Sequence, residues 1–165
     1  MQTHEWTLRP ATPVDAAGCG HVHFQSWVET YTGLANDAFW ERASAERSIE
    51  IWQQWLDNGL DATVAEADGG IVGLAFSRDG RDNYGFEAVR DRELYTLYVL
   101  RSHHGTGIGQ SLLDAVLPPG TPAQLWVAEH NPRARRFYER NGFRADGAAD
   151  PGDSFGGIAA IRMVR

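Results

Sequence analysis

Three glycines at alternate positions, Gly105, Gly107 and Gly109, form the clearest candidate binding site in the sequence. They lie between an aromatic and aliphatic stretch, Glu93–Leu100, and a stretch with helical spacing of apolar residues, Ile108–Leu117. Glycine lets the backbone approach a ligand closely, and the first turn of a helix presents unpaired N–H groups with a partial positive charge. This strand, loop and helix therefore predict a binding site for an anion.

Two familiar phosphate-binding patterns do not fit these glycines. A P-loop ends in Gly-Lys-Ser/Thr, whereas Gly109 is followed by Gln110. A dinucleotide-binding fingerprint has the spacing G-x-G-x-x-G near a first βα turn, whereas here the spacing is G-x-G-x-G late in the chain. A turn without a ligand would explain one or two glycines, but three cost more backbone entropy than a simple turn requires.

The elements that must position this loop can be predicted along the whole chain. The predicted strands are Trp6–Arg9, Ala62–Glu66, Ile71–Phe76, Glu93–Leu100, Gln124–Ala128, Phe143–Ala145 and Ile158–Val164. The predicted helices run from Thr12-Pro13 to Tyr31, from Ser44 to Asn58, from Ile108 to Leu117, and from Asn131-Pro132 to Asn141-Gly142. Because hairpins flank a single β-loop-α-β crossover, the order predicts an α+β (mixed α/β) fold in one domain, residues 1–165.

The first predicted helix has one apolar face, and the first third of the chain is dense in aromatic residues. The face comprises Val14, Ala17, His21, Phe24, Val28 and Tyr31. We expect this face to be buried, with His21 as a core or pocket residue. Most of the aromatic side chains are expected to pack in the core, and some to line a substrate pocket: Phe24, Trp27, Tyr31, Phe39, Trp40, Trp52 and Trp55.

Composition limits the class of partner and the location. The net charge of −7 argues against nucleic acid as a partner, because phosphate binding needs a basic surface. Cys19 is the only cysteine, and its place in a predicted helix favours a buried structural thiol over a nucleophile. No apolar run is long enough to span a bilayer and the first residues lack a signal-peptide core, so we expect a cytoplasmic protein without a membrane partner.

The histidines do not suggest a metal site. His103 and His104 are adjacent and project differently, while His21 and His23 are two positions apart and fall on different sides of a helix. Neither pair presents two ring nitrogens to one ion, so no metal is predicted.

At this point the sequence resembles the GNAT N-acetyltransferase superfamily. Leu97-Tyr98-Val99 followed by His104-Gly105-Thr106-Gly107-Ile108-Gly109 is similar to its acetyl-CoA-binding motif. A second stretch, Leu125-Trp126-Val127 leading to Asn131, Ala134, Phe137-Tyr138 and Gly142-Phe143, also matches the family. One position departs from it, since His104 stands where Arg or Gln is usual. We therefore expect weaker or pH-dependent cofactor binding.

The resemblance implies a single GNAT-like domain with a central mixed, mostly antiparallel sheet flanked by helices. It also implies transfer of an acetyl group from the co-substrate acetyl-CoA to a primary amine, by direct attack in a ternary complex. The implied cofactor-binding residues are Leu97, Tyr98, Val99, His104, Gly105, Thr106, Gly107, Ile108, Gly109, Gln110, Asn131 and Tyr138.

The resemblance also suggests which residues move protons. Tyr138 matches the tyrosine that often protonates the leaving thiolate, and Glu93 matches a glutamate that some members use as a base, acting here through water. Glu129 is the alternative base, and Glu93 could instead be a solvent-facing residue at a strand start. Asn131, which precedes Pro132, could cap a helix as well as touch the pantetheine.

Alternative functions remain open at the level of sequence. One is a catalytically silent acyl-CoA-binding module or sensor. Another is a toxin-like transferase that acts on charged tRNA, which the acidic net charge disfavours. For the leading hypothesis the acceptor is a small-molecule or peptide amine, and a homodimer is possible because relatives often form one.

Overall fold

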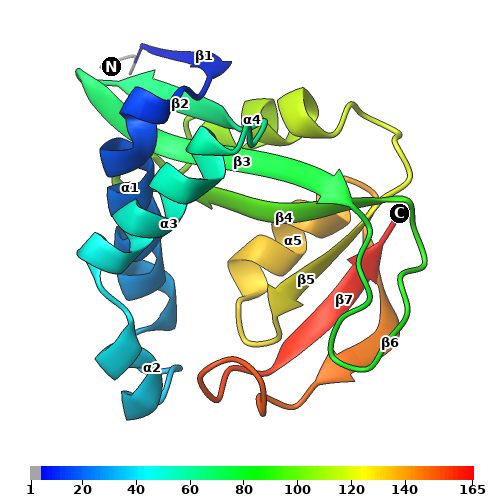
Figure 1. Cartoon of the computed structure of the whole chain (residues 1–165). Helices are drawn as coiled ribbons and strands as arrows, with labels where there is room; N and C mark the ends of the chain where they lie inside the picture. Colours follow the sequence, from blue (N-terminus) through cyan, green and yellow to red (C-terminus); the bar gives the residue numbers. More distant parts are fainter. Residues whose placement is uncertain (1–4) are drawn as a thin grey trace. The chain divides into compact units, whose positions relative to one another are not determined.

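The computed structural model describes residues 5–165, which form seven strands and five α-helices (Figure 1). The strands are β1 (Trp6–Pro10), β2 (Thr63–Ala67), β3 (Gly70–Asp79), β4 (Arg92–Val99), β5 (Gln124–Ala128), β6 (Arg144–Asp150) and β7 (Ala160–Val164). The helices are α1 (Ala16–Tyr31), α2 (Asp37–Arg42), α3 (Ala45–Asp57), α4 (Ile108–Val116) and α5 (Pro132–Arg140), with short 3₁₀ turns η1 (Pro13–Asp15) and η2 (Arg101–His103).

The strands follow the order β1-β2-β3-β4-β5-β7-β6 in one sheet. β4 pairs with β5 in parallel, whereas the pairs β1–β2, β2–β3, β5–β7 and β6–β7 are antiparallel. The predicted α+β class with a mixed, mostly antiparallel sheet flanked by helices is confirmed. By its internal contacts the described chain divides into two compact units, one of residues 5–32, 43–76 and 96–116, the other of residues 33–42, 77–95 and 117–165.

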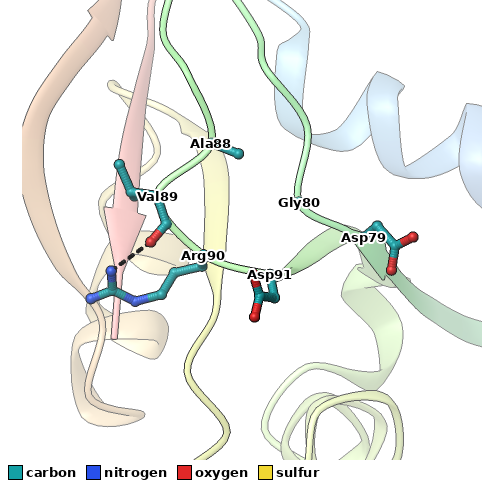
Figure 2. Close-up of a pocket in the computed structure, with 6 residues that line it drawn as sticks. All are labelled: Asp79, Gly80, Ala88, Val89, Arg90 and Asp91. Atoms are coloured by element: carbon teal, nitrogen blue, oxygen red, sulfur yellow. Dashed lines mark hydrogen bonds between the residues drawn. The ribbon is translucent and has the colours of Figure 1, made fainter.

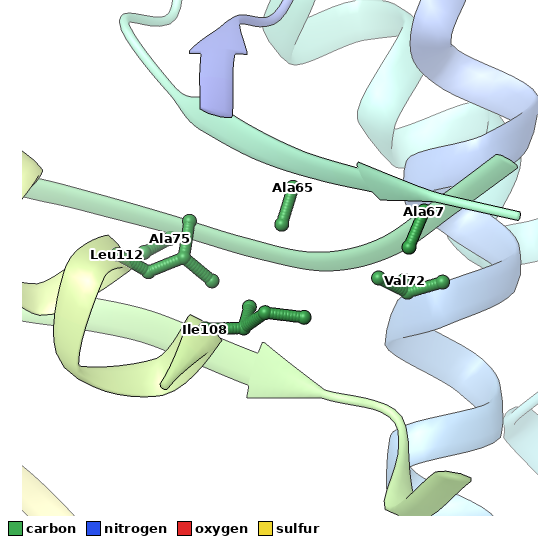
Figure 3. Packing of buried hydrophobic residues seen from close by; sticks show 6 residues of the cluster. All are labelled: Ala65, Ala67, Val72, Ala75, Ile108 and Leu112. Atoms are coloured by element: carbon green, nitrogen blue, oxygen red, sulfur yellow. The ribbon is translucent and has the colours of Figure 1, made fainter. Parts of the chain in front are cut away.

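The core of the first unit forms where α4 packs on the β2–β3 hairpin (Figure 3). Ile108 and Leu112 of the helix are fully buried against small strand residues such as Ala65 and Ala75. A Cβ at Gly73 would lie 3.1 Å from the Leu112 side chain, so the strand position beneath the helix has little room for a larger residue. This packing fixes the N-terminal turn of α4, where the glycine-rich loop ends.

Helix α1 buries a different face from the predicted one. Val14 is 89% exposed because it belongs to the η1 turn, and His21 is exposed as well. The buried residues of α1 are Ala16, Cys19, Gly20, Val22, His23 and Ser26. A Cβ at Gly20 would lie 2.5 Å from the backbone of Ile49 in α3, so small residues make the contact between the helices. Cys19 is buried as expected, and burial raises the pKa of its thiol to about 12.

The sheet of the second unit has an apolar and a polar face. Leu94, Leu125 and Met163 are buried on the apolar face, where consecutive partners on β4, β5 and β7 place them on the same side. Glu93 and Gln124 are paired on the opposite face and are also fully buried. A buried carboxylate and a buried amide require partners, and these determine the geometry of this unit.

Two features of the second unit differ from the sequence prediction. Helix α2 was not predicted, because its six residues are too few for a periodic pattern; Asn36 caps it by accepting a hydrogen bond from the Phe39 amide at 2.9 Å. Strand β6 continues past Ala145 to Asp150, through a register shift between Ala145 and Ala149. The Asp146-Gly147 dipeptide resembles a turn in sequence, because a β-bulge uses the same residue types.

We predict that Asp15→Asn lowers the free energy of unfolding at pH 7 by about 2 kcal/mol. Asp15 is 7% exposed and accepts two hydrogen bonds from the Arg9 guanidinium, at 2.7 and 2.8 Å. The Arg9 hydrogen bond, opposed by burial and reinforced by the Thr12 amide, lowers the pKa of Asp15 from 3.8 to about 2. The carboxylate therefore stabilises the fold above its unfolded pKa, and the effect disappears as the pH falls from about 4 to about 2.

Urea unfolding of both proteins at neutral and acidic pH measures this effect. Asp61→Asn removes an exposed carboxylate and is the matched control, with no expected change. A wild-type to Asp15→Asn difference that stays constant down to pH 2 would contradict the prediction.

Candidate active site

The glycine-rich loop of the first unit leaves a row of backbone N–H groups without partners. Gly105 and Gly107 have φ values of 75° and 90°, which favour glycine, and the chain then enters α4 at Ile108. Within residues 5–165, the amides of residues 105–109 donate no hydrogen bond to another group of the chain. Several unpaired donors at the positive end of a helix fit a phosphate or pyrophosphate, as the sequence predicted.

Residues outside the predicted motif hold this loop in place. The Trp6 indole donates to the Thr106 carbonyl at 3.2 Å, and the Thr106 hydroxyl donates to the His103 carbonyl at 2.6 Å. The His103 ring lies 2.9 Å from Asp68, at the tip of the β2–β3 hairpin. No sequence motif connects Trp6 or Asp68 with the loop, because only the sheet brings them to it.

The His104 side chain also contacts the backbone of the loop. Its Nε2 atom lies 2.9 Å from the Val99 carbonyl oxygen, so this nitrogen must carry the proton that it donates. A contact from His104 to a phosphate would therefore have to come from Nδ1. This arrangement leaves the backbone amides as the main anion donors of the loop.

The end of β4 that belongs to the first unit carries Leu97, Tyr98 and Val99. Leu97 and Val99 pack against the hydrophobic core beneath α4, and Tyr98 alternates to the other side of the strand. The Tyr98 hydroxyl accepts a hydrogen bond from the Trp27 indole at 2.9 Å, and burial raises the pKa of the phenol. Tyr98 therefore joins β4 to an aromatic cluster on α1.

His23, and not His21, is the histidine of this cluster. Its ring lies 4.8 Å from the Trp27 ring and 4.9 Å from the Tyr98 ring, and its Nδ1 accepts a hydrogen bond from the Trp52 indole at 3.0 Å. Burial lowers the pKa of His23 to about 4. The ring is therefore neutral at pH 7, with its proton on Nε2.

Asn131 and Tyr138 lie on α5 in the second unit. The Asn131 side chain accepts a hydrogen bond from the Ala134 amide at 3.2 Å, so its role as the cap of α5 is confirmed. Tyr138 is 8% exposed, with its ring 5.3 Å from Phe137 and 5.9 Å from Phe143. These contacts fix the position of the Tyr138 ring within this unit.

Glu93 does not face solvent, because it is 1% exposed and held by two side chains. Arg81 donates to one oxygen from Nε at 2.7 Å and to the other from its amide at 3.3 Å. Gln124 donates from Nε2 to Oε1 at 2.6 Å. Three of the roughly four lone-pair positions of the carboxylate are thus occupied, which leaves room for one further donor on Oε2.

The remaining predicted residues, Gln110 and Glu129, lie near the surface. The Gln110 amide donates to Asp114 at 3.0 Å along the exposed side of α4. The Glu129 side chain is 47% exposed and lies 3.8 Å from His130. Glu129 therefore has freer access to water than Glu93.

A cavity of about 580 Å³ opens at the base of the loop between β3 and β4 (Figure 2). It is lined by Asp79, Gly80, Ala88, Val89, Arg90 and Asp91. A Cβ at Gly80 would lie 2.0 Å from the Arg90 carbonyl oxygen, so this closure of the loop depends on glycine. None of the predicted site residues lines this cavity.

Residues 5–165 contain no cluster of three or more His, Cys, Asp or Glu side chains arranged to hold a metal ion. Within the same residues, no helix combines the length and the apolar character needed to cross a bilayer. The prediction that the protein uses no metal stays a prediction.

Comparisons with known sequences point to one family. The sequence model of the acetyltransferase (GNAT) family matches residues 23–143. A Mycobacterium tuberculosis protein named "probable N-acetyltransferase" is 29% identical, over 89% of this chain and 84% of that protein. An Archaeoglobus fulgidus protein named "uncharacterized N-acetyltransferase" is 33% identical, over 72% of this chain and 82% of its own length.

The fold has many counterparts among solved structures. A Salmonella typhimurium structure described with its cofactor acetyl-CoA has a TM-score of 0.68 and 21% identity, covering 98% of this chain and 93% of that chain. At this identity the similarity shows a shared fold.

We predict that burial of His23 makes the protein less stable as the pH falls from about 6.5 to about 4. The folded pKa of about 4 lies below the usual 6.5, so the unfolded chain binds the proton more readily over this range. The loss reaches about 3 kcal/mol at the acidic end. In His23→Gln, whose amide oxygen can still accept from Trp52, this pH dependence should be absent.

Guanidinium unfolding at several pH values between 7 and 4 compares the two proteins. His21→Gln is the control, because it removes an exposed histidine of the same helix. Parallel stability curves for the wild type and His23→Gln would show that His23 does not titrate as predicted.

Proposed function

Because the chain belongs to the acetyltransferase (GNAT) family and is an acetyl-CoA-dependent N-acetyltransferase, we propose that it acetylates a primary amine by direct attack in a ternary complex. The acceptor is a small-molecule or peptide amine. A direct route is supported by Cys19, the only cysteine of the chain, which is buried and has a thiol pKa of about 12. The chain therefore offers no reactive thiol for a covalent acetyl-enzyme.

The observation that carries this proposal is the row of unpartnered amides at residues 105–109. These donors stand at the N-terminus of α4 and would hold the pyrophosphate of acetyl-CoA, which supplies the activated thioester. The His104 ring and the Gln110 amide would add side-chain contacts at the edges of the loop. The remainder of the binding energy would come from the pantetheine arm.

The strand before the loop would align that arm. Backbone groups of Leu97, Tyr98 and Val99 are suited to pair with the amides of pantetheine as an added strand would. The Val99 N–H would stabilise the oxyanion that develops on the thioester carbonyl. Asn131 would add a contact to pantetheine while it caps α5.

The reaction itself requires two proton transfers. The amine nitrogen bonds to the acetyl carbonyl carbon as it loses a proton, and the C–S bond then breaks. We assign the base to Glu93, through a single water on Oε2, with the more exposed Glu129 as the alternative. The hydroxyl of Tyr138 would give its proton to the departing thiolate.

The location proposed for this activity is the cytoplasm, which also supplies acetyl-CoA. A single cysteine, free and buried, is in keeping with a reducing compartment.

An acetylation screen tests the proposed function. The full chain is incubated with acetyl-CoA and a panel of alkylamines, amino-acid amides and peptides with free N-termini or lysines, and products are identified by mass spectrometry. Acetylation of at least one amine class is the expected result. Binding of CoA without acetylation of any amine would favour a silent acyl-CoA-binding module instead.

We predict that Gly107→Ala raises the Kd for CoA by about tenfold or more. A Cβ at this position, with φ near 90°, strains the loop and intrudes where the backbone must approach a phosphate. Gly69→Ala is the matched control, because Gly69 has a φ of 82° at a hairpin tip outside the loop. Isothermal titration calorimetry measures the CoA affinity of both variants. Equal losses of affinity in Gly107→Ala and Gly69→Ala would refute a role specific to the loop.

We predict that Tyr138→Phe lowers kcat by about a hundredfold or more while leaving CoA affinity nearly unchanged, because only the proton donor is removed. Phe137→Leu, a change of the neighbouring ring, serves as the control for packing. The measurement is steady-state kinetics by thiol release, and an unchanged kcat in Tyr138→Phe would remove the tyrosine from the mechanism.

We also predict that Glu93→Gln lowers kcat while leaving CoA affinity nearly unchanged, because only the proposed base is removed. A merely structural Glu93 would instead lower the melting temperature and leave kcat of the folded enzyme unchanged. The same measurements on Glu129→Gln distinguish the two candidate bases.

A further inference from the structure

Five polar or aromatic side chains of the second unit share the polar face of its sheet. The register pairs Glu93 with Gln124, Trp126 with Arg162, Ala128 with Ala160, and Asp150 with Ala160. Partners on neighbouring strands, and residues two apart on one strand, project to the same side. Glu93, Gln124, Trp126, Arg162 and Asp150 therefore lie on one face, and the two alanines between Trp126 and Asp150 add little volume to it.

All but one of the charged groups on this face have a counter-charge. Glu93 is paired with Arg81 at 2.7 Å, and Arg162 is paired with Asp146 at 2.8 Å. Asp150 is 6% exposed, and its buried Oδ2 atom has no hydrogen-bond partner among residues 5–165. Asp150 is thus the exception in a face whose other charges are neutralised.

The aromatic residues of this face include a second unpartnered group. The Trp126 indole N–H is buried and donates to no group in the described part of the chain. Tyr84 packs edge-on against the Trp126 ring at 4.8 Å, from the turn that joins Asn83 and Phe86. Burial raises the pKa of Tyr84, and the charge of Asp150 contributes to the rise, so the phenol and the carboxylate are electrostatic neighbours.

A buried carboxylate without a partner is costly, because the lost hydration is not replaced. Few such groups persist in native proteins without an explanation. An alkylammonium group would supply the missing charge and three donors to Asp150. Aromatic rings attract cations, and the Trp126 ring already has the Arg162 guanidinium 5.8 Å from its centroid, so within residues 5–165 the Tyr84 ring is the one of the two without such a contact. An anionic group would instead be repelled by Asp150.

We propose that Asp150, with the rings of Trp126 and Tyr84, binds an alkylammonium group of the acceptor and so selects cationic amines. This inference rests on the proposed acetyl transfer to an amine and adds the substrate class. The bound group is either the reacting amine before it loses its proton or a second ammonium of the same molecule. In both cases the partner of Asp150 is a substrate cation.

Kinetics of Asp150→Asn with n-butylamine and 1,4-diaminobutane test the assignment. We expect KM to rise about tenfold or more with little change in kcat, because the variant loses an ion pair with the substrate and keeps the side-chain shape. If KM rises for both amines, the group bound by Asp150 is the reacting nitrogen. If KM rises for the diamine alone, the bound group is the second ammonium. An unchanged KM for both overturns the proposal.

Asp153→Asn is the matched control, since it removes an exposed carboxylate from the loop that follows β6. Thermal unfolding distinguishes a binding role of Asp150 from a structural one. If Asp150 is unpaired until a substrate cation binds, Asp150→Asn melts at the same or a higher temperature than the wild type, because the variant lacks an unpaired buried charge. A clear fall in melting temperature would assign Asp150 to the fold and overturn the proposal.

Binding measured without acetyl-CoA separates this inference from the proposed function. Calorimetric titration with n-butylammonium chloride, against n-butanol as the neutral counterpart, should give binding that Asp150→Asn loses and Asp153→Asn retains. If the protein acetylates amines but binds ammonium equally well without Asp150, only the inference about Asp150 is refuted. If ammonium binding needs Asp150 but the protein acetylates no amine, only the proposed function is refuted.

Discussion

The buried carboxylate of Glu93 is the group around which the second unit is organised. A charge that is 1% exposed is tolerable only with well-placed partners, and Arg81 and Gln124 supply them. Gln124 also accepts a hydrogen bond from the Val89 amide at 2.8 Å. One buried pair on β4 and β5 thus holds the loop of residues 80–91 near both of its ends, and the Gly80 amide closes its base by donating to the Asp91 carbonyl at 2.8 Å.

The glycine-rich loop of the first unit shows the opposite arrangement, because its backbone N–H donors have no partners among the described residues. Secondary structure normally consumes such donors, and the loop avoids this with two left-handed glycines and a helix that starts at Ile108. Contacts to Trp6 and Asp68 hold the loop in shape without using its amides. The unpaired donors belong to the backbone, so His104 in place of the family's usual Arg or Gln leaves these donors unchanged.

Much of this structure could be predicted from sequence, chiefly where a local pattern decides the outcome. The start of a helix at Ser44, the cap at Asn131 and the strand Gln124–Ala128 were predicted and are confirmed. The buried face of α1 was predicted wrongly, because periodicity weighs large apolar residues whereas Gly20 allows the backbone of α3 to approach.

The candidate site was predictable only in its local motifs. Glu93 was identified, but its partners lie 12 and 31 residues away, at distances that only the sheet closes. Asp150 gave no signal at all, since its place on the polar face depends on a register that shifts within β6. Long-range pairing of charges is thus the part that the sequence pattern cannot supply.

Tyr84 has a backbone conformation that opposes its side chain. With a φ of 51° it occupies the left-handed region in a turn completed by Gly85 at 81°, where glycine or asparagine would be the relaxed choice. Its ring, however, covers Trp126. Glycine or asparagine at this position would relieve the backbone strain but would remove the ring from Trp126. A variant of this turn selected for a higher melting temperature would therefore lose the aromatic contact that lies in the electrostatic neighbourhood of Asp150.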